Sequence, residues 1–299
     1  AGQSIVAILS IIFGLKKMAE DGLTIQAVIS IVIGVLFTFL FVRRQNHLDS
    51  PLIDLRLFRI PTFSISLLAY MAGAFVSFGG SVFIAQYLQL VLGLSPLVAG
   101  LWMLPWTLGF IVGSLLTPAM TRYMKPVTLM IIGFALAAIG YAILMQVHYL
   151  PPLVALVTGS IITSISMAPI FTLTTDFILS SAPPEKTGAA SAISETSAEM
   201  GGALGVAILG SIGTAIYRVA LASNAPASIP ANVIAASQDT LGEALTEAGK
   251  LKVGAAELML TAKNSFTDAL QYILLISAII SAILAIVIYL RLGGRRTAQ

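Results

Sequence analysis

Two glutamates in the second half of the sequence, Glu195 and Glu199, are the residues best suited to do chemistry. They stand four residues apart inside an apolar stretch, so in a helix both carboxylates lie on one face, one turn apart. In a medium of low dielectric, two carboxylates this close are not expected to be ionised together. Such a pair can exchange a proton near neutral pH and can attract a lipophilic cation. The alternative is a structural role, in which both side chains hydrogen-bond neighbouring helices.

A third acid and a group of glycines lie near this pair. Asp176 also falls in an apolar stretch, but within about a turn of its end, so contact with water is the alternative to an accessory role. Gly201, Gly202 and Gly205 follow Glu199, and small residues spaced four apart let helix backbones approach closely. We therefore expect the acidic face to adjoin a close contact between helices.

Aromatic side chains recur in the apolar stretches that precede the pair. A desolvated cation over an aromatic ring gains about 0.5–2 kcal/mol, so these rings are candidates for the wall of a substrate cavity. Contact with lipid, or an aromatic belt at the membrane interface, is the alternative. The candidate cavity residues are Tyr70, Phe78, Trp102, Trp106 and Phe110.

The composition indicates what kind of chain must position these groups. Of the 299 residues, 58% are hydrophobic and only 10% are charged, and the mean hydropathy is +0.97. A soluble domain carries about 25% charged residues, so this chain cannot coat a water-facing surface of its size. We predict an all-α, polytopic membrane helix bundle. Cysteine is absent, which excludes disulfides and thiolate metal sites.

About eight apolar segments are candidates to cross a bilayer as helices. They are Ser4–Gly14, Leu23–Val42, Pro61–Leu92, Leu97–Thr121, Pro126–Val147, Pro151–Leu179, Gly188–Tyr217 and Phe266–Leu290. Two other stretches are not spans. Residues 43–60 are charged and amphipathic, and residues 218–265 are polar and contain two prolines.

The basic residues assign the two sides of the membrane. One set of alternate loops carries ten of the 16 basic residues, namely Arg43, Arg44, Arg56, Arg59, Arg122, Lys125, Lys186, Arg291, Arg295 and Arg296. Short cytoplasmic loops are rich in Lys and Arg, so we expect this side to be cytoplasmic, with both ends of the chain on it. This placement of the basic residues, rather than nucleic acid binding, accounts for the pI near 9.2. The expected location is the inner (cytoplasmic) membrane.

The polar stretch 218–265 would then lie on the extracytoplasmic side of the membrane as a helical hairpin. Pro230–Gly249 and Val253–Phe266 are predicted helices joined by a turn. Asp239, Glu243 and Glu247 would form an acidic stripe on the first helix, at spacings of four. Such a stripe is commonly a solvated face, and the sharper hypothesis is that it draws cations outward at the exit.

Three motifs resemble a known family. Residues 51–58 read PLIDLRLF, Leu94-Ser95-Pro96 is followed by Ala99-Gly100 and Leu104-Pro105, and the segment from Gly188 to Ala207 contains the glutamates and glycines above. Together they resemble the fourteen-span drug/proton antiporters of the major facilitator superfamily, above all exporters of quaternary ammonium compounds and methyl viologen. The match runs over essentially the whole chain.

The resemblance implies a domain organisation. Residues 1–42 would be two linker transmembrane helices, residues 43–60 a cytoplasmic segment, and residues 61–299 the C-terminal six-helix bundle with its outer hairpin at 218–265. The chain would be a portion of a longer protein whose N-terminal six-helix bundle is its partner. Arg122 and Lys125 would belong to a cytoplasmic loop motif, from which Arg122-Tyr123 departs. Phe110 stands where some relatives carry a further acid, so the cation preference would differ.

The function expected from these residues is proton-coupled multidrug efflux by alternating access. The cargo would be lipophilic cations such as quaternary ammonium compounds, dyes and viologens, with the proton gradient as energy source and no cofactor, metal or nucleic acid. Export of a metabolite or lipid on the same fold is one alternative, and a non-transporting membrane sensor or scaffold is another. An enzyme is not expected, because the sequence contains no hydrolytic triad, metal-ligand spacing or phosphate-binding loop.

Overall fold

In the computed structural model the described residues, 2–21, 24–45 and 56–293, are helices joined by short turns. The long helices are α1 (Gly2–Asp21), α2 (Ile25–Gln45), α3 (Pro61–Gln86), α4 (Pro96–Met120), α5 (Pro126–Leu144), α6 (Pro152–Ser180), α7 (Thr187–Ser223) and α10 (Ala255–Ile288). The short ones are η1 (Leu57–Arg59), η2 (Tyr87–Val91), η3 (Met145–His148), η4 (Pro184–Lys186), α8 (Ala231–Ser237), α9 (Leu241–Lys250) and η5 (Tyr289–Gly293). The predicted all-α class is confirmed.

Seven of these helical segments, within the described part of the chain, are long and apolar enough to cross a bilayer. They correspond to α2 to α7 and α10. The first helix, α1, contains a shorter apolar stretch, Ile5–Gly14. Many large apolar side chains of these helices are exposed, among them Leu97 and Leu115 of α4, each at 75%. A chain of this kind satisfies its backbone hydrogen bonds within each helix and exposes apolar surface to lipid, which makes it a multi-pass membrane protein.

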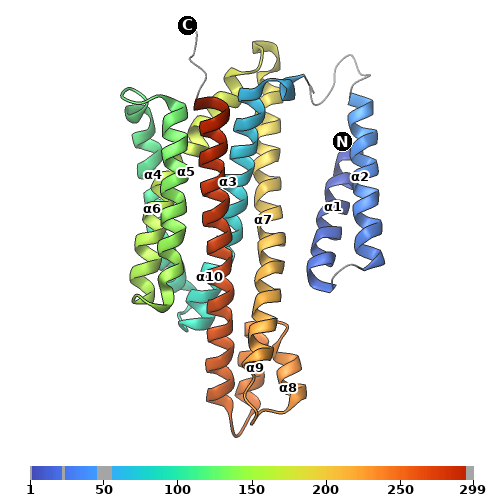
Figure 1. The fold of residues 1–299 in the computed structure, drawn as a ribbon, viewed down its shortest axis with the longest axis vertical. Coiled ribbons are helices and arrows are strands. Elements are labelled where there is room, and N and C mark those ends of the chain that lie inside the picture. The colour runs from blue at the N-terminus through green and yellow to red at the C-terminus, as the bar shows by residue number, and fades with distance from the viewer. Residues whose placement is uncertain (1, 22–23, 46–55, 294–299) are drawn as a thin grey trace.

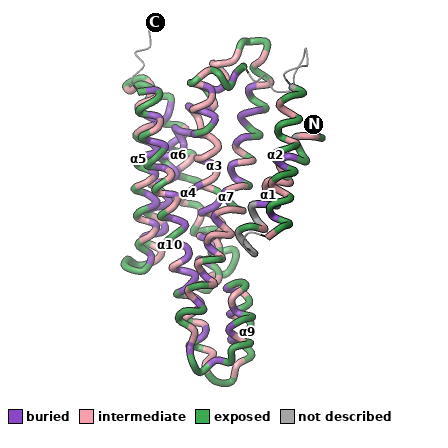
Figure 2. Tube along the Cα trace, turned by 45° about the vertical axis from the view of Figure 1, so that its right-hand side comes forward, coloured by how far each residue is buried: buried purple, intermediate pink, exposed green. Residues whose placement is uncertain are grey.

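Helices α3 to α7 and α10 form one bundle, with α6 packed against α3, α4, α5 and α7 (Figure 1). We call one end the basic end, because its described loops hold Arg59, Arg122, Lys125 and Lys186. The opposite end is the hairpin end, where α8 and α9 lie beside the extended ends of α7 and α10 (Figure 1). Buried residues follow the inward faces of the helices and continue into the hairpin end (Figure 2).

Glycines let the helices of this bundle approach one another. A Cβ at Gly113 of α4 would lie 2.8 Å from the Ile165 carbonyl oxygen of α6. One at Gly133 of α5 would lie 2.7 Å from the Ser166 carbonyl oxygen. Between helices surrounded by lipid, such close packing replaces the hydrophobic drive that operates in water. The contacts therefore hold α4 and α5 against α6.

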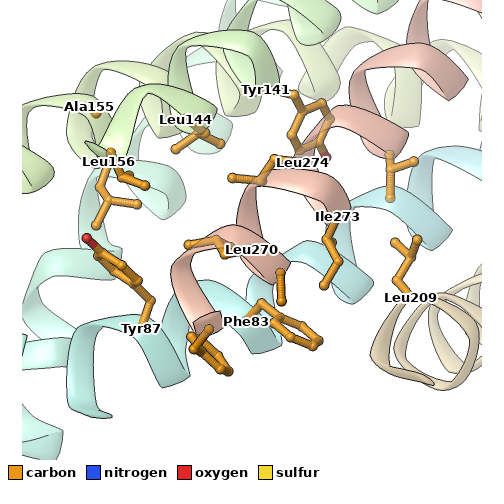
Figure 3. Packing of buried hydrophobic residues seen from close by; sticks show 14 of the residues in the cluster. Phe83, Tyr87, Tyr141, Leu144, Ala155, Leu156, Leu209, Leu270, Ile273 and Leu274 are labelled. Atoms are coloured by element: carbon orange, nitrogen blue, oxygen red, sulfur yellow. The ribbon is translucent and has the colours of Figure 1, made fainter. Parts of the chain in front are cut away.

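A continuous apolar core joins α3, α5, α6, α7 and α10 (Figure 3). Phe83 stacks on Phe266, with ring centroids 5.5 Å apart, while Leu270 and Ile273 of α10 are fully buried beside it. Tyr141 is 3% exposed and belongs to the same core. This core ties the helices that carry the site to the two long helices that reach the hairpin end.

Helices α1 and α2 form an antiparallel pair. In α1 and α2, Gly14 and Gly34 face side chains of the partner helix, where a Cβ would come within 2.6 Å of Ile31 or 2.5 Å of Ile11. Helix α1 also contacts α7. The predicted amphipathic segment 43–60 lies mostly outside the described residues, as does most of the PLIDLRLF motif. The described part of segment 43–60 consists of the end of α2 and the single turn η1.

The prediction of one helix over Pro230–Gly249 is wrong, because the chain bends between α8 and α9. Thr240 is the N-cap of α9, where its Oγ1 accepts a hydrogen bond from the Glu243 backbone N–H at 3.1 Å. A Thr at this position starts a new helix by satisfying an otherwise free donor. The second predicted helix, Val253–Phe266, is the first part of α10, which runs on without a break to Ile288.

The predicted acidic stripe on one helix is consequently wrong as well. Asp239 precedes the cap of α9 and pairs instead with Arg218 of α7, Nη2 to Oδ1 at 3.4 Å. Glu247 on α9 pairs with Lys250 at 2.6 Å. Two of the three acids are thus engaged with local basic residues. Residues spaced four apart share one face only when all of them belong to the same helix. Here Asp239 lies before the N-cap of α9, so it does not share a face with the other two acids.

Candidate functional site

The carboxylate pair, Glu195 and Glu199, lies well inside α7. This helix begins at Thr187, so the two residues stand roughly 12 and 18 Å along its axis from the basic end. Both side chains are exposed, whereas Ile193, Ser194 and Ser197 on the opposite face are buried in the bundle. The pair therefore occupies the face of α7 that the described helices leave open.

The glycines after the pair fix the position of α7. A Cβ at Gly201 would collide with the Met71 carbonyl oxygen of α3, and one at Gly205 would collide with the Phe75 carbonyl oxygen. At Gly202 it would lie 3.2 Å from the Phe78 ring. Glycine at these places lets α7 lie directly against α3, which sets the rotation that turns the carboxylate pair away from the core.

Tyr70 on α3 is the residue that the structure brings to the carboxylate pair. Both Glu195 and Glu199 are near enough to act on its hydroxyl electrostatically, and its hydroxyl meets the Thr175 side chain of α6. The ring is half-buried. A phenol that contacts a threonine hydroxyl and lies within electrostatic range of two carboxylates can orient a proton or a ligand, because it both donates and accepts hydrogen bonds.

A chain of aromatic contacts continues from Tyr70 across three helices. The Tyr70 ring meets Phe171 edge-on at 5.2 Å between centroids, and Phe171 meets Phe110 edge-on at 5.8 Å. Phe110 in turn stacks on Trp106 at 5.5 Å. We call Tyr70, Phe171, Phe110 and Trp106 the aromatic chain. It leads from the carboxylate pair on one side of the bundle to α4 on the other.

Phe171 is the member of the aromatic chain that the sequence did not predict. Its position in α6, four residues before Thr175, carries no motif. The predicted cavity aromatics come only from the two spans that became α3 and α4, although α6 is a span of the same kind. The pairing of Phe171 with both Tyr70 and Phe110 depends on helix packing, which no sequence spacing reports.

The other predicted cavity aromatics are placed together but at a different level. Phe78, Trp102 and Trp106 line a cavity of about 330 Å³ between α3, α4, α5 and α6, which we call the indole pocket. Its wall includes hydroxyl groups of α5 and α6, which the sequence did not connect with these rings. Trp106 belongs to both the pocket and the aromatic chain.

The remaining candidate residues lie apart from the pair. Asp176 is exposed near the basic end of α6, and its neighbour Thr175 rather than Asp176 meets Tyr70. Arg122 and Lys125 are exposed in the turn between α4 and α5, where Lys125 precedes Pro126 at the helix start. Across the described residues, no group of three or more His, Cys, Asp or Glu side chains is arranged to hold a metal ion.

Known membrane transporters resemble this chain over most of its length. Residues 2–237 match the family profile of the Major Facilitator Superfamily. The multidrug efflux pump LfrA of Mycolicibacterium smegmatis is 33% identical over 266 residues, 89% of this chain and 52% of LfrA. The methyl viologen resistance protein SmvA of Salmonella typhimurium is 29% identical over 253 residues, 83% of this chain and 50% of SmvA. The chain thus spans about half the length of these curated relatives.

One solved structure supports the same fold. It is a crystal structure of a bacterial homologue of the human lysosomal transporter Spinster, in an inward-facing and unoccupied conformation. It superposes with a TM-score of 0.61 over 92% of this chain and 60% of the other, at 14% sequence identity. With the helical bundle, the matching profile and the efflux-pump relatives in agreement, the chain belongs to the Major Facilitator Superfamily.

Proposed function

We propose that the full-length protein is a proton-coupled exporter of lipophilic cations, such as quaternary ammonium compounds, dyes and viologens. The observation that carries this proposal is the carboxylate pair, one helical turn apart on the open face of α7, beside Tyr70. Alternating access between this bundle and an N-terminal six-helix bundle would expose the pair to each side in turn.

The chemistry of the pair supports coupling of a proton to a cation. When partner helices enclose α7, two neighbouring carboxylates lose solvation and repel each other, and one bound positive charge relieves that repulsion. A lipophilic cation neutralises the same site, so proton and cargo compete for it. That competition is what exchange of an inward proton for an outward cation requires. Neutral or anionic cargo would favour basic residues in the spans instead.

The relatives support the same class of cargo. LfrA is named as a multidrug efflux pump and SmvA as a methyl viologen resistance protein, and viologens are dications. Tyr70, Phe110 and Trp106 would supply aromatic surface to such cations near the pair. In this proposal Asp176 is an accessory acid near the cytoplasmic mouth, and Arg122 and Lys125 belong to a cytoplasmic loop.

The proposal includes an orientation in the cytoplasmic membrane. The described loops at the basic end contain Arg59, Arg122, Lys125 and Lys186, and positively charged loops remain on the cytoplasmic side. The carboxylate pair would then be reached from the cytoplasm along α7, and α8 and α9 would lie outside. Both ends of the 299-residue chain would be cytoplasmic.

Efflux of ethidium from cells that express the full-length protein tests the proposal. We expect saturable efflux that stops when a protonophore collapses the proton gradient. Glu199→Gln should lower efflux about tenfold or more, which corresponds to about 1.4 kcal/mol, because the amide neither ionises nor carries a proton to the other side. Glu185→Gln is the matched control, since Glu185 is exposed in η4 before the start of α7, and it should retain wild-type efflux.

The membrane level of each variant must be measured alongside by immunoblotting. Efflux that persists with the protonophore would contradict proton coupling. Full activity of Glu199→Gln at wild-type abundance would assign this residue a structural role.

A further inference from the structure

The indole pocket lies nearer the hairpin end than the carboxylate pair does. Phe78 follows Tyr70 by eight residues on α3, so the two rings stand roughly 12 Å apart along the helix. The pocket's volume of about 330 Å³ is at the lower end of the range for small-molecule sites, about 300–1,000 Å³. It can therefore hold part of a drug-sized molecule rather than the whole.

The lining has a distinct chemistry. Phe78, Trp102, Trp106 and Tyr141 supply aromatic surface from three helices, while Ser160 and Thr163 supply hydroxyls from α6. Among the described residues that line the pocket, none is charged. The lining supplies no counter-ion, so the charged group of a cargo is held more strongly at the carboxylate pair than in the pocket. A flat aromatic ring, by contrast, gains contact with indole faces, and a charge delocalised over that ring is tolerated by them.

Thr163 indicates that the pocket is suited to a polar substituent as well. Its side chain lines the pocket and is 2% exposed, yet its Oγ1 makes no hydrogen bond within the described structure. Buried hydroxyls are nearly always paired, so one left free beside a cavity is available to a ligand or to water. The Tyr141 hydroxyl lies beside Ser77 on the same wall.

Phe78 connects this pocket with the face of the carboxylate pair. Its ring lines the pocket and also lies 3.2 Å from where a Cβ of Gly202 would be, three residues beyond Glu199. It is 55% exposed, and Trp102 is 39% exposed. The aromatic chain reaches the same pocket through Trp106. A molecule held at Glu199 can thus contact the pocket without crossing the bundle core.

We propose that the indole pocket is a second substrate subsite, which binds the planar aromatic portion of a cargo while the carboxylate pair holds the charged group. This inference rests on the proposed export function, because it assigns the charged group of a cargo to the carboxylate pair and its aromatic ring to the indole pocket. The carboxylate pair attracts positive charge on every substrate. The indole pocket discriminates among substrates by the presence of a fused ring system with a hydrogen-bonding substituent.

Two probes separate the subsites in the full-length protein. Ethidium has a planar fused ring with amino substituents, whereas dodecyltrimethylammonium has the charged group and an alkyl chain without a ring. We expect Trp102→Ala to raise the KM for ethidium efflux about tenfold and to leave that for dodecyltrimethylammonium within about twofold. Trp102→Phe, which keeps a ring, should recover most of the ethidium affinity. Glu199→Gln should impair efflux of both probes.

A second substitution that keeps the side-chain volume separates loss of binding from loss of folding. Thr163→Val removes only the free hydroxyl and should raise the ethidium KM about threefold without affecting the alkyl probe. Phe39→Ala is the control, because it removes an aromatic ring that is 61% exposed on α2 and that does not line the pocket. It should leave both KM values unchanged.

The outcomes distinguish this inference from the function on which it rests. Equal increases in KM for both probes, or an unchanged ethidium KM in Trp102→Ala and Thr163→Val, would overturn the subsite while proton-coupled efflux stands. Absence of proton-coupled efflux in the wild-type protein would overturn the proposed function instead. Direct titration of ethidium fluorescence with the purified full-length protein should give the same order of affinities, wild type above Thr163→Val and Trp102→Ala.

Discussion

Single glycines decide how α7 meets α3. Gly201 and Gly205 face backbone carbonyl oxygens of α3, while Gly210 on the same helix has no neighbour within 4 Å of where its Cβ would be. The backbone cannot yield as a flexible side chain can, so a methyl group at Gly205 must push the helices apart. The same substitution thus has opposite expected effects at two positions of one helix.

We therefore predict that Gly205→Ala destabilises the full-length protein by about 1–3 kcal/mol, the usual cost of overpacking. Gly210→Ala should be neutral or stabilising by up to about 1 kcal/mol, because alanine favours the helix and meets open space. Thermal unfolding in detergent, followed by the loss of monodisperse protein on size-exclusion chromatography, measures both. A lower unfolding temperature for Gly210→Ala than for Gly205→Ala would contradict the assigned contact.

At the scale of elements, hydrogen bonds and buried apolar side chains hold the hairpin end together. The Tyr217 hydroxyl donates to the Ser237 carbonyl at 3.0 Å, and Ser228 donates to Glu257 at 2.9 Å. The first bond joins α7 to α8, and the second joins the turn before α8 to the start of α10. Helices α8 and α9 are each too short to be stable alone in water, and packing against each other and against α10 stabilises them.

Thr240→Ala removes the cap of α9 and should cost about 1 kcal/mol of local stability. We expect faster amide hydrogen exchange over residues 241–250 and little change in α3 to α6. Thr246→Ala is the matched control, because the Thr246 hydroxyl only bonds back to the Gly242 carbonyl within α9. Equal acceleration in the two variants would show that the cap does not hold this helix.

At the scale of the whole molecule, two exposed residues mark opposite ends. Tyr123 is 89% exposed in the turn at the basic end, and Val253 is 81% exposed at the hairpin end. The 299-residue sequence contains no cysteine, so a single introduced thiol within it reports its own side. In intact cells, Val253→Cys should react with a membrane-impermeant maleimide, whereas Tyr123→Cys should react only after permeabilisation. The reverse pattern would invert the proposed orientation.

Much of the fold was predictable because a bilayer restricts the choices. In lipid, a run of apolar residues can hydrogen-bond all of its backbone N–H and C=O groups within the run only by forming a helix. The long helices therefore follow from composition and length. The break between α8 and α9 was missed, because outside the bilayer a single cap at Thr240 outweighs the continuous helical pattern. Asp239 pairs with Arg218 of α7, a contact that the spacing of four between the acids does not predict.

The sequence by itself determined the membrane class and the two carboxylates that share a face of one helix, because both follow from local patterns. Only the tertiary structure decided which other groups join them. Tyr70 lies within electrostatic range of the pair, Phe171 completes the aromatic chain, and Trp102 lines one cavity with hydroxyl groups of α6. These contacts depend on how closely glycines let the helices approach and on the resulting rotation of each helix, and neither is encoded at any fixed separation along the chain.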